Sequence, residues 1–317
     1  MAFTSYSGQD LVLIVPTKDR PHQVRNLLNS IYIQAVYPNS IVVVDYGGNS
    51  ESVVKDFEQK LPLTYISSPI GGQIYQRNLG ISLVQSSHRL IGFLDDDLVL
   101  GHDALSQMID FWNAAPPDTG GVGFNIINCP PFRFSPLFSL AFLSSPKPGD
   151  ILISGYNSSI QNIPTSTRVR WLGGGYTVWS AEILKVNQQE PLKTHWAIGE
   201  DLRFSYPIGR SSPLFVNASA KVRHEHVYDQ APGLSVYYYR GKKSVISIYY
   251  FVNLYRPQFS LAACFWMLLV KFNLRLISGV VKFNLGIFIQ GLGEMAGFFL
   301  CFILMIRKSN ILPNLED

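Results

Sequence analysis

Three adjacent carboxylates, Asp95, Asp96 and Asp97, are the residues of this 317-residue sequence that most directly indicate chemistry. They follow Leu94 and the apolar segment 89–93, which predicts a buried strand. Consecutive acids at the end of a strand repel one another unless a cation neutralises them, so a bound divalent metal ion would account for them. A solvated acidic turn is the alternative interpretation.

The first hundred residues predict the sheet that positions these acids. Strand patterns alternate with helix patterns, as in an α/β fold with a doubly wound, mostly parallel sheet. The predicted strands are 11–15, 41–44, 63–66 and 89–93, and the predicted helices begin at Pro21 and cover 53–57 and 74–84. Ligands of such sheets bind outside the carboxyl ends of the strands. Asp19, Asp45 and the acidic triplet all fall at that edge, which favours a binding site over a solvated turn.

Five short motifs occur in a recognisable order along residues 11–226. They are residues 15–21, 43–45, 76–80, 94–97 and 199–201. Their order resembles that of the family 2 glycosyltransferases, which are inverting enzymes with a nucleotide-diphospho-sugar transferase fold of the A type. One position departs from the family pattern, because Gln76 stands where the family has a small residue. The resemblance implies transfer of a hexosyl group from a nucleotide diphosphate to an acceptor hydroxyl.

The resemblance also implies a donor site at the edge of the sheet. Asp19 and Asp45 would face the nucleobase, and Arg77 would reach toward the nucleotide. The nucleotide-sugar-binding residues implied are Pro16, Thr17, Asp19, Arg20, Asp45, Arg77, Asp95 and Asp96. The expected donor is a nucleotide-diphosphate sugar of the UDP, dTDP or GDP type.

A divalent ion, Mn²⁺ or Mg²⁺, is expected to stabilise the departing diphosphate. Side chains alternate along an extended chain, so Asp95 and Asp97 should point to one side and Asp96 to the other. We therefore expect Asp97 to ligate the metal directly, Asp95 to serve the ribose or a metal-bound water, and Asp96 to orient the loop. His224 matches a histidine that many family members hold near the metal, with His226 as the alternative.

Inversion at the anomeric carbon requires a general base for the acceptor hydroxyl. The resemblance assigns this role to Asp201, with Glu200 as the less favoured base and a possible acceptor contact. Acids at a helix start that only complement the helix dipole are the alternative. Trp171, Gly173 and Gly174 belong to a segment that resembles the acceptor-binding side of the family, although a tight turn with core tryptophans would show the same pattern.

The C-terminal quarter combines positive charge with hydrophobicity. Residues 240–308 contain nine Lys or Arg and a single acid, Glu294. The apolar segment 259–270 stops before Lys271 after 12 residues, too short to cross a bilayer of ~30 Å. The segment 285–306 is long enough, but its charge makes it a poor ordinary span and its glycines indicate close helix packing.

We therefore expect these helices to associate with a membrane as amphipathic or re-entrant helices, with one true transmembrane helix as a close alternative. Lys271, Arg275 and Lys282 would lie on the polar face of an interfacial helix. The basic residues are spaced along apolar segments, which favours an anionic membrane surface and argues against nucleic acid as a partner.

The sequence predicts a catalytic domain over 1–239, with a nucleotide-binding half (1–100) and an acceptor half (101–239), followed by a helical membrane-associating region over 240–317. The first residues lack the charged and apolar regions of a secretory signal, and the three cysteines lack a zinc-binding spacing. We expect the protein on the cytoplasmic side of the cell membrane, peripheral or with one to two inserted helices. Its acceptor would be a glycan or lipid-linked precursor in polysaccharide or glycolipid synthesis.

Two other functions stay open at this point. A sugar-phosphate nucleotidylyltransferase also uses acids on a similar sheet, but residues 16–20 lack its glycine-rich basic loop. A non-catalytic nucleotide-sugar or glycan-binding membrane protein would need a ligand site but no base, so Asp97 and Asp201 together argue against it.

Overall fold

The computed structural model describes residues 5–131, 133, 139, 144, 146–190, 198–225 and 232–315. The chain divides into two compact units. The first unit comprises Met1–Phe132, Ser159–Pro191 and Phe204–Val227, and the second comprises Arg133–Ser158, Leu192–Arg203 and Tyr228–Asp317.

A nine-stranded sheet forms the core of the first unit, with β3-β2-β1-β4-β8-β6-β9-β5 in order and β7 paired with β9. The strands are β1 (Leu11–Lys18), β2 (Ser40–Tyr46), β3 (Leu63–Ser67), β4 (Leu90–Leu94), β5 (Leu98–Leu100), β6 (Gly121–Ile126), β7 (Thr167–Val169), β8 (Tyr176–Ser180) and β9 (Leu214–His224). The first four strands along the chain run parallel, as their apolar patterns predict. Beyond β4 the sheet is mixed, because β8 runs antiparallel to both β4 and β6.

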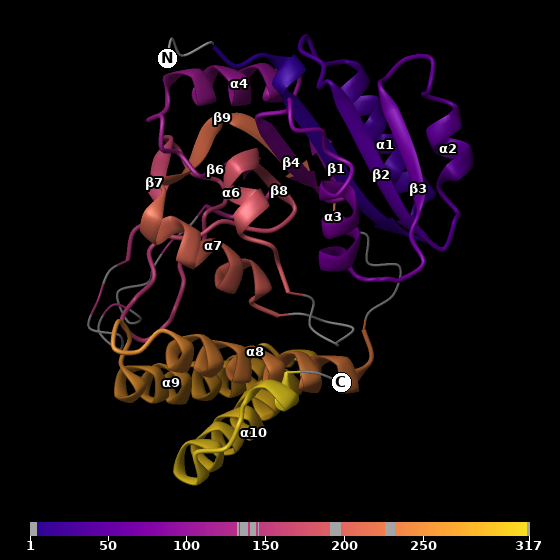
Figure 1. Ribbon diagram of the computed structural model, residues 1–317. Coiled ribbons are helices and arrows are strands. Elements are labelled where there is room, and N and C mark those ends of the chain that lie inside the picture. Colours follow the sequence, from indigo (N-terminus) through magenta and orange to yellow (C-terminus); the bar gives the residue numbers. More distant parts are fainter. Residues whose placement is uncertain are drawn as a thin grey trace. The chain divides into compact units, whose positions relative to one another are not determined.

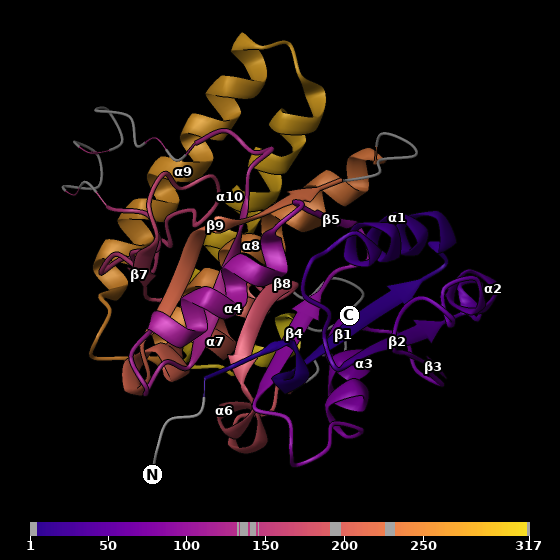
Figure 2. The ribbon, with the colours of Figure 1, turned by 90° about the horizontal axis from the view of Figure 1, so that it is seen from above.

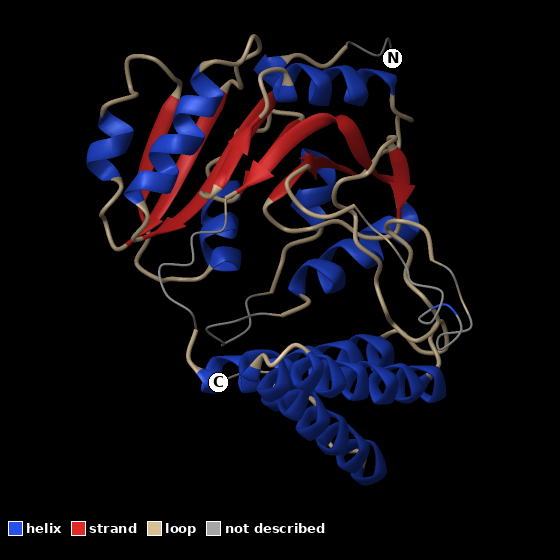
Figure 3. Ribbon diagram, turned by 180° about the vertical axis from the view of Figure 1, so that it is seen from behind, coloured by secondary structure: helices blue, strands red, loops and turns tan. Residues whose placement is uncertain are grey.

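Helices cover both faces of this sheet. The helices are α1 (Pro21–Tyr32), α2 (Glu51–Lys55), α3 (Gln73–Ile81), α4 (Ala104–Ala114), α6 (Ala181–Val186) and α7 (Glu200–Ser211), the last beginning in the second unit and ending in the first. Figure 2 shows α1 and α3 on opposite sides of β1 and β2, and in Figure 3 α1 and α2 cover the face toward the viewer. The predicted α/β class with a doubly wound, mostly parallel sheet is confirmed.

The third helix is shorter than its sequence pattern indicates. We predicted a helix over 74–84, but α3 ends at Ile81. Leu83 N–H donates to Gly80 O, and Val84 N–H to Ile81 O, so the chain tightens into turns with bonds three residues apart. The exposed Leu83 gives the chain no burial to gain from one more helical turn.

Three long helices dominate the second unit (Figure 1). They are α8 (Leu234–Leu254), α9 (Leu261–Val281) and α10 (Leu285–Arg307), so that residue 239 lies inside α8. Glycines allow α10 to approach α8 closely, because a Cβ at Gly293 would overlap the carbonyl oxygen of Tyr238 and one at Gly241 would overlap that of Gln290. The predicted glycine-mediated helix packing is confirmed.

α9 continues well beyond the point where its apolar segment meets Lys271, for 21 residues in all. Lys271 Nζ lies 3.5 Å from a Glu294 carboxylate oxygen, and Arg275 Nε lies 2.9 Å from the same oxygen. The expectation that both cations lie on an outward polar face is therefore wrong, because they turn toward α10. α9 and α10 are each long and apolar enough to cross a membrane, judged by length and composition.

Candidate active site

The acidic triplet forms the link between β4 and β5. Asp95 N–H donates to Gly175 O at 2.7 Å, which ties the loop to the segment before β8. Gly175 must be glycine here, because a Cβ would overlap the carboxylate of Asp95. After Asp97 the chain enters β5, where Leu98 pairs with His224 of β9. The triplet is therefore held from both sides by neighbouring backbone.

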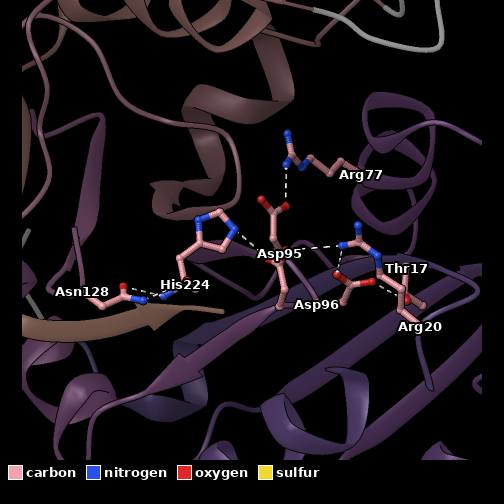
Figure 4. Close-up of polar contacts among 8 residues, drawn as sticks. Thr17, Arg20, Arg77, Asp95, Asp96, Asn128 and His224 are labelled. Atoms are coloured by element: carbon pink, nitrogen blue, oxygen red, sulfur yellow. Dashed lines mark hydrogen bonds and ion pairs between the residues drawn. The ribbon is translucent and has the colours of Figure 1, made fainter. Parts of the chain in front are cut away.

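Asp96 turns away from Asp95, as alternation along the chain predicts (Figure 4), whereas its carboxylate and that of Asp97 both accept from Arg20 Nη1. It accepts hydrogen bonds from Thr17 Oγ1 at 2.7 Å and from Arg20 Nη1 at 3.1 Å. Burial raises the pKa of Asp96 to about 6, against the opposing effects of Thr17 and Arg20. These contacts join the triplet loop to the end of β1.

Asp95, Asp97 and His224 form a cluster whose potential ligand atoms all lie within 4.8 Å of one another. His224 Nε2 lies 2.8 Å from Asp97 Oδ1. Burial disfavours protonation of His224, but the hydrogen bond and charge of Asp97 outweigh it and raise the pKa of the imidazole. Two carboxylates and an imidazole nitrogen at this separation fit a divalent cation such as Mn²⁺ or Mg²⁺.

The backbone of His224 is fixed from a second direction. Asn128 Oδ1 accepts from His224 N–H, and Asn128 Nδ2 donates to His224 O, both at 3.0 Å (Figure 4). Glu225 N–H in turn donates to Asp97 O at 2.8 Å. Sequence reasoning did not identify Asn128, which lies 96 residues from its partner. His226 lies outside the described residues.

Arg77 enters the site from α3 and is almost fully buried, at 1% exposure. Its Nη2 donates to Asp95 Oδ1 at 2.9 Å (Figure 4). Within the described part of the chain, its Nε and Nη1 find no hydrogen-bond partner. Buried donors without partners are costly, so these two N–H groups favour an anionic or strongly accepting ligand beside Asp95.

Asp45 lies at the carboxyl end of β2 and is completely buried. Its Oδ2 accepts from Ser50 N–H at 2.8 Å and from Tyr65 O–H at 3.1 Å, whereas Oδ1 has no partner among the described residues. Burial, and then the charge of Asp45, raise the pKa of Tyr65 to about 12, so this phenol stays a donor at neutral pH. Asp45 therefore keeps one acceptor atom for a ligand.

Asp19 follows β1 and has a left-handed backbone conformation, with φ of 53°. Its Oδ1 accepts from Asn49 Nδ2 at 2.6 Å, and a Cβ at Gly47 would lie 2.6 Å from the same oxygen. The loops after β1 and β2 are thus joined side by side. Pro16 lies within β1, in register with Val44 of β2.

Gln76, the departure from the family pattern, has a structural role. Its Nε2 donates to Thr17 O at 2.8 Å and to Val44 O at 2.6 Å. The amide therefore bridges the ends of β1 and β2, the two strands that carry Asp19 and Asp45.

The glycine-rich segment before β8 lies against the triplet loop through Gly175. Gly173 is packed on the ring of Tyr176, which a Cβ would overlap. Trp171 is partly buried against the core, and Trp179 is fully buried and donates to Thr177 Oγ1. The core interpretation therefore holds for Trp179.

Glu200 and Asp201 form the first turn of α7 and belong to the second unit, whereas the acidic triplet belongs to the first. Gly199 precedes them with φ of 74°, a left-handed conformation that favours glycine. The predicted helix start is thus present.

This sheet, with carboxylates at the carboxyl ends of β1, β2 and β4, is that of a nucleotide-sugar transferase of the A type. Residues 12–160 match the model of the family described as "Glycosyl transferase family 2", and this segment belongs to that family. The resemblance predicted from the motifs is confirmed for this segment. No curated protein sequence matches the chain.

Solved structures with this fold cover almost the whole chain. S. aureus TarS 1-349 is 15% identical, with a TM-score of 0.56 over 97% of this chain and 83% of that one. The same protein in complex with UDP-GlcNAc is 17% identical, with a TM-score of 0.55 over 97% and 84%. Mannosyltransferase PcManGT from Pyrobaculum calidifontis, in complex with GDP-Man and Mn2+, is 13% identical, with a TM-score of 0.56 over 96% and 89%.

Proposed function

We propose that this protein is an inverting, metal-dependent glycosyltransferase that moves a hexosyl group from a nucleotide diphosphate to an acceptor hydroxyl. The observation that carries the proposal is the Asp95, Asp97 and His224 cluster beside the buried Arg77, whose Nε and Nη1 have no hydrogen-bond partner among the described residues. A cation site next to buried cationic donors is what a bound diphosphate requires.

Asp95, Asp97 and His224 would hold the metal ion. When bound, Mn²⁺ or Mg²⁺ supplies Lewis-acid stabilisation of the negative charge on the departing diphosphate. Arg77 contributes a fixed positive charge from the protein side, because α3 and the Asp95 ion pair hold its guanidinium in place. Asn128 keeps His224 oriented through the backbone, so the imidazole needs little rearrangement to bind.

The nucleoside would bind over the ends of β1 and β2. Asp45 offers a buried acceptor atom to a base N–H, and Asp19, fixed by Asn49, offers a second carboxylate at the same edge. Pro16 and Thr17 shape the strand end beneath it, and Arg20 holds Asp96 and Asp97 in position. Two structures of similar fold were solved in complex with UDP-GlcNAc and with GDP-Man, which supports a nucleotide-sugar donor.

Asp201 is our candidate for the general base, with Glu200 assigned to the acceptor. The base would take the proton of the acceptor hydroxyl as its oxygen attacks the anomeric carbon from the side opposite the diphosphate. The start of α7 suits such a role, because a helix N-terminus favours the ionised carboxylate. Trp171, Gly173 and Gly174 would line the acceptor path beside Asp95.

We also propose that the protein acts at the cytoplasmic face of the cell membrane, on a lipid-linked or polysaccharide precursor. Support comes from α9 and α10, where Lys271 and Arg275 turn toward Glu294 while apolar side chains face outward. The exposed residues of these two helices include Trp266, Leu269, Ile277, Val280, Phe299, Phe302, Ile303 and Ile306. Water is a poor solvent for such a surface, whereas lipid tails suit it.

The decisive experiment compares Asp97→Asn and Asp201→Asn with wild type in nucleotide binding and in transfer. We expect wild type to be stabilised against heat by a nucleotide sugar only when Mn²⁺ or Mg²⁺ is present. Asp97→Asn should lose this metal dependence, and Asp201→Asn should keep it while transfer falls by about 10²–10⁴-fold. Asp118→Asn, which changes an exposed acid of the first unit, is the control.

The metal assignment and the base assignment can each be contradicted by one result. Unchanged metal dependence in Asp97→Asn would show that the cluster does not hold the ion. Wild-type turnover in Asp201→Asn would remove that residue as the base.

A further inference from the structure

The turn that leads into α7 is fastened to α8 by a small polar network inside the second unit. Ser247 Oγ of α8 donates to Ile198 O at 2.6 Å. Arg203 Nη1 donates to the same carbonyl at 3.3 Å and to Ser247 Oγ at 3.2 Å. Ser247 is only 4% exposed, so the bonds are protected from competition by water.

The turn also lies directly against the helix. A Cβ at Gly199 would overlap Ser247 Oγ, so the missing side chain is what permits the contact. The left-handed φ of Gly199 turns the chain at this point and starts α7 at the next residue. Both the conformation and the close approach therefore require glycine.

Arg203 completes the network from the other side of the two acids. Its guanidinium lies 5.8 Å from the ring centroid of Tyr250, one helical turn from Ser247 on α8. Burial lowers the pKa of Arg203, and the charges of Glu200 and Asp201 act in the opposite direction. The turn is thus held on α8 through the carbonyl of Ile198, through the close contact of Gly199 and through the side chain of Arg203.

We propose that Ser247 and Arg203 are positioning residues for glycosyl transfer, which fix the Glu200–Asp201 turn on α8. This inference rests on the proposed role of Asp201 as the base. It makes α8 part of the catalytic apparatus in addition to its packing against α10. The rate of a catalysed reaction depends strongly on the position of the base, since a displacement of about 1 Å lowers the rate on the order of 10²-fold.

The test is Ser247→Ala, with Ser244→Ala as the matched control one turn earlier on the same helix, where the hydroxyl donates to Gly241 O of its own helix. We expect Ser247→Ala to lower kcat by about 10–100-fold. The KM for the nucleotide sugar, the metal-dependent thermal stabilisation and the melting temperature of the unliganded protein should stay close to wild type. Arg203→Lys, which keeps the charge but loses the guanidinium fork, should show the same pattern.

The Asp201→Asn background separates a positioning role from a general structural one. There, Ser247→Ala should not reduce the residual transfer further, because the group it positions is already absent. Three results would overturn the inference. The first is a kcat of Ser247→Ala equal to that of Ser244→Ala, and the second is a fall in donor affinity and melting temperature together with kcat. The third is a double variant, Ser247→Ala with Asp201→Asn, in which the rate losses of the two single variants multiply.

The outcomes also distinguish the two proposals. Normal turnover in Asp201→Asn would remove the base assignment itself and with it this inference. Loss of turnover in Asp201→Asn together with full activity in both Ser247→Ala and Arg203→Lys would leave the base in place and remove only the positioning role.

Discussion

Arg77 and Asp95 show how a single ion pair can prepare a metal site. The guanidinium is buried and the carboxylate is 18% exposed, so their 2.9 Å contact is shielded from water. The pair neutralises Asp95, one of the three residues proposed to hold the metal ion. If a cation bound to Asp95 as proposed, the positive charge of Arg77 would become available to the diphosphate.

We expect Arg77→Met to destabilise the metal-free protein by about 1–3 kcal/mol, because Asp95 then lacks a cation next to Asp97. Mn²⁺ should restore much of this loss by binding to the carboxylates. Urea denaturation with and without Mn²⁺ measures both effects. The control is Arg25→Met, which breaks an exposed pair with Asp56 and should cost under about 1 kcal/mol whether or not metal is present. Equal losses in the two variants would contradict the metal-coupled role.

At the scale of elements, the glycines of α10 differ in the kind of atom that they contact on α8. Gly293 faces a backbone carbonyl of α8, at Tyr238, which cannot move without moving the helix. Gly286 faces the ring of Tyr237, a side chain that can rotate away. The two positions belong to the same helix but tolerate a methyl group very differently.

Gly293→Ala should therefore lower the melting temperature, since overpacking costs about 1–3 kcal/mol. Gly286→Ala should be neutral or stabilising, because alanine is favoured over glycine in a helix by about 1 kcal/mol. Thermal unfolding of both variants in detergent tests the difference. A Gly293→Ala protein as stable as wild type would mean that α8 and α10 separate at little cost.

At the scale of the whole molecule, apolar and charged side chains of α9 and α10 are arranged opposite to those of helices in water. Lys271 and Arg275 face Glu294, which is 1% exposed, and the outer surface of α9 carries Trp266 and Ile277. In a soluble protein the cations would face outward. This arrangement supports lipid as the surroundings of the outer surface.

We expect the full chain to stay with membranes after alkaline extraction and to need detergent for release. Glu294→Gln should shift protein out of the extraction-resistant fraction, because two partly buried cations then lose their acid. Glu182→Gln, at an exposed position of the first unit, serves as the control. Full recovery of wild type in the soluble fraction without detergent would contradict membrane association.

Much of this structure can be predicted from local patterns in the sequence. The apolar segments predict β1 to β4 and their parallel order, and alternation along the chain predicts the separation of the Asp95 and Asp96 side chains. Both follow from periodicities that need no knowledge of distant residues.

What the sequence does not predict depends on contacts between distant residues. Asn128 reaches His224 across 96 residues, and Ser247 reaches Ile198 across 49. The length of α9 also could not be predicted, because Lys271 interrupts the apolar pattern and its ion-pair partner, Glu294, lies on another helix. No local pattern signals such a partner.

The Lys271, Arg275 and Glu294 cluster has a consequence for biosynthesis of the proposed membrane-bound protein. The ribosome makes α9 before α10, so the two cations emerge before their acid exists. Lys271 is the central residue of α9, where an unpaired Lys or Arg costs about 2.5–3.5 kcal/mol on insertion. α9 should therefore wait at the surface until α10 has been made, and the two helices should enter the bilayer together as one hairpin.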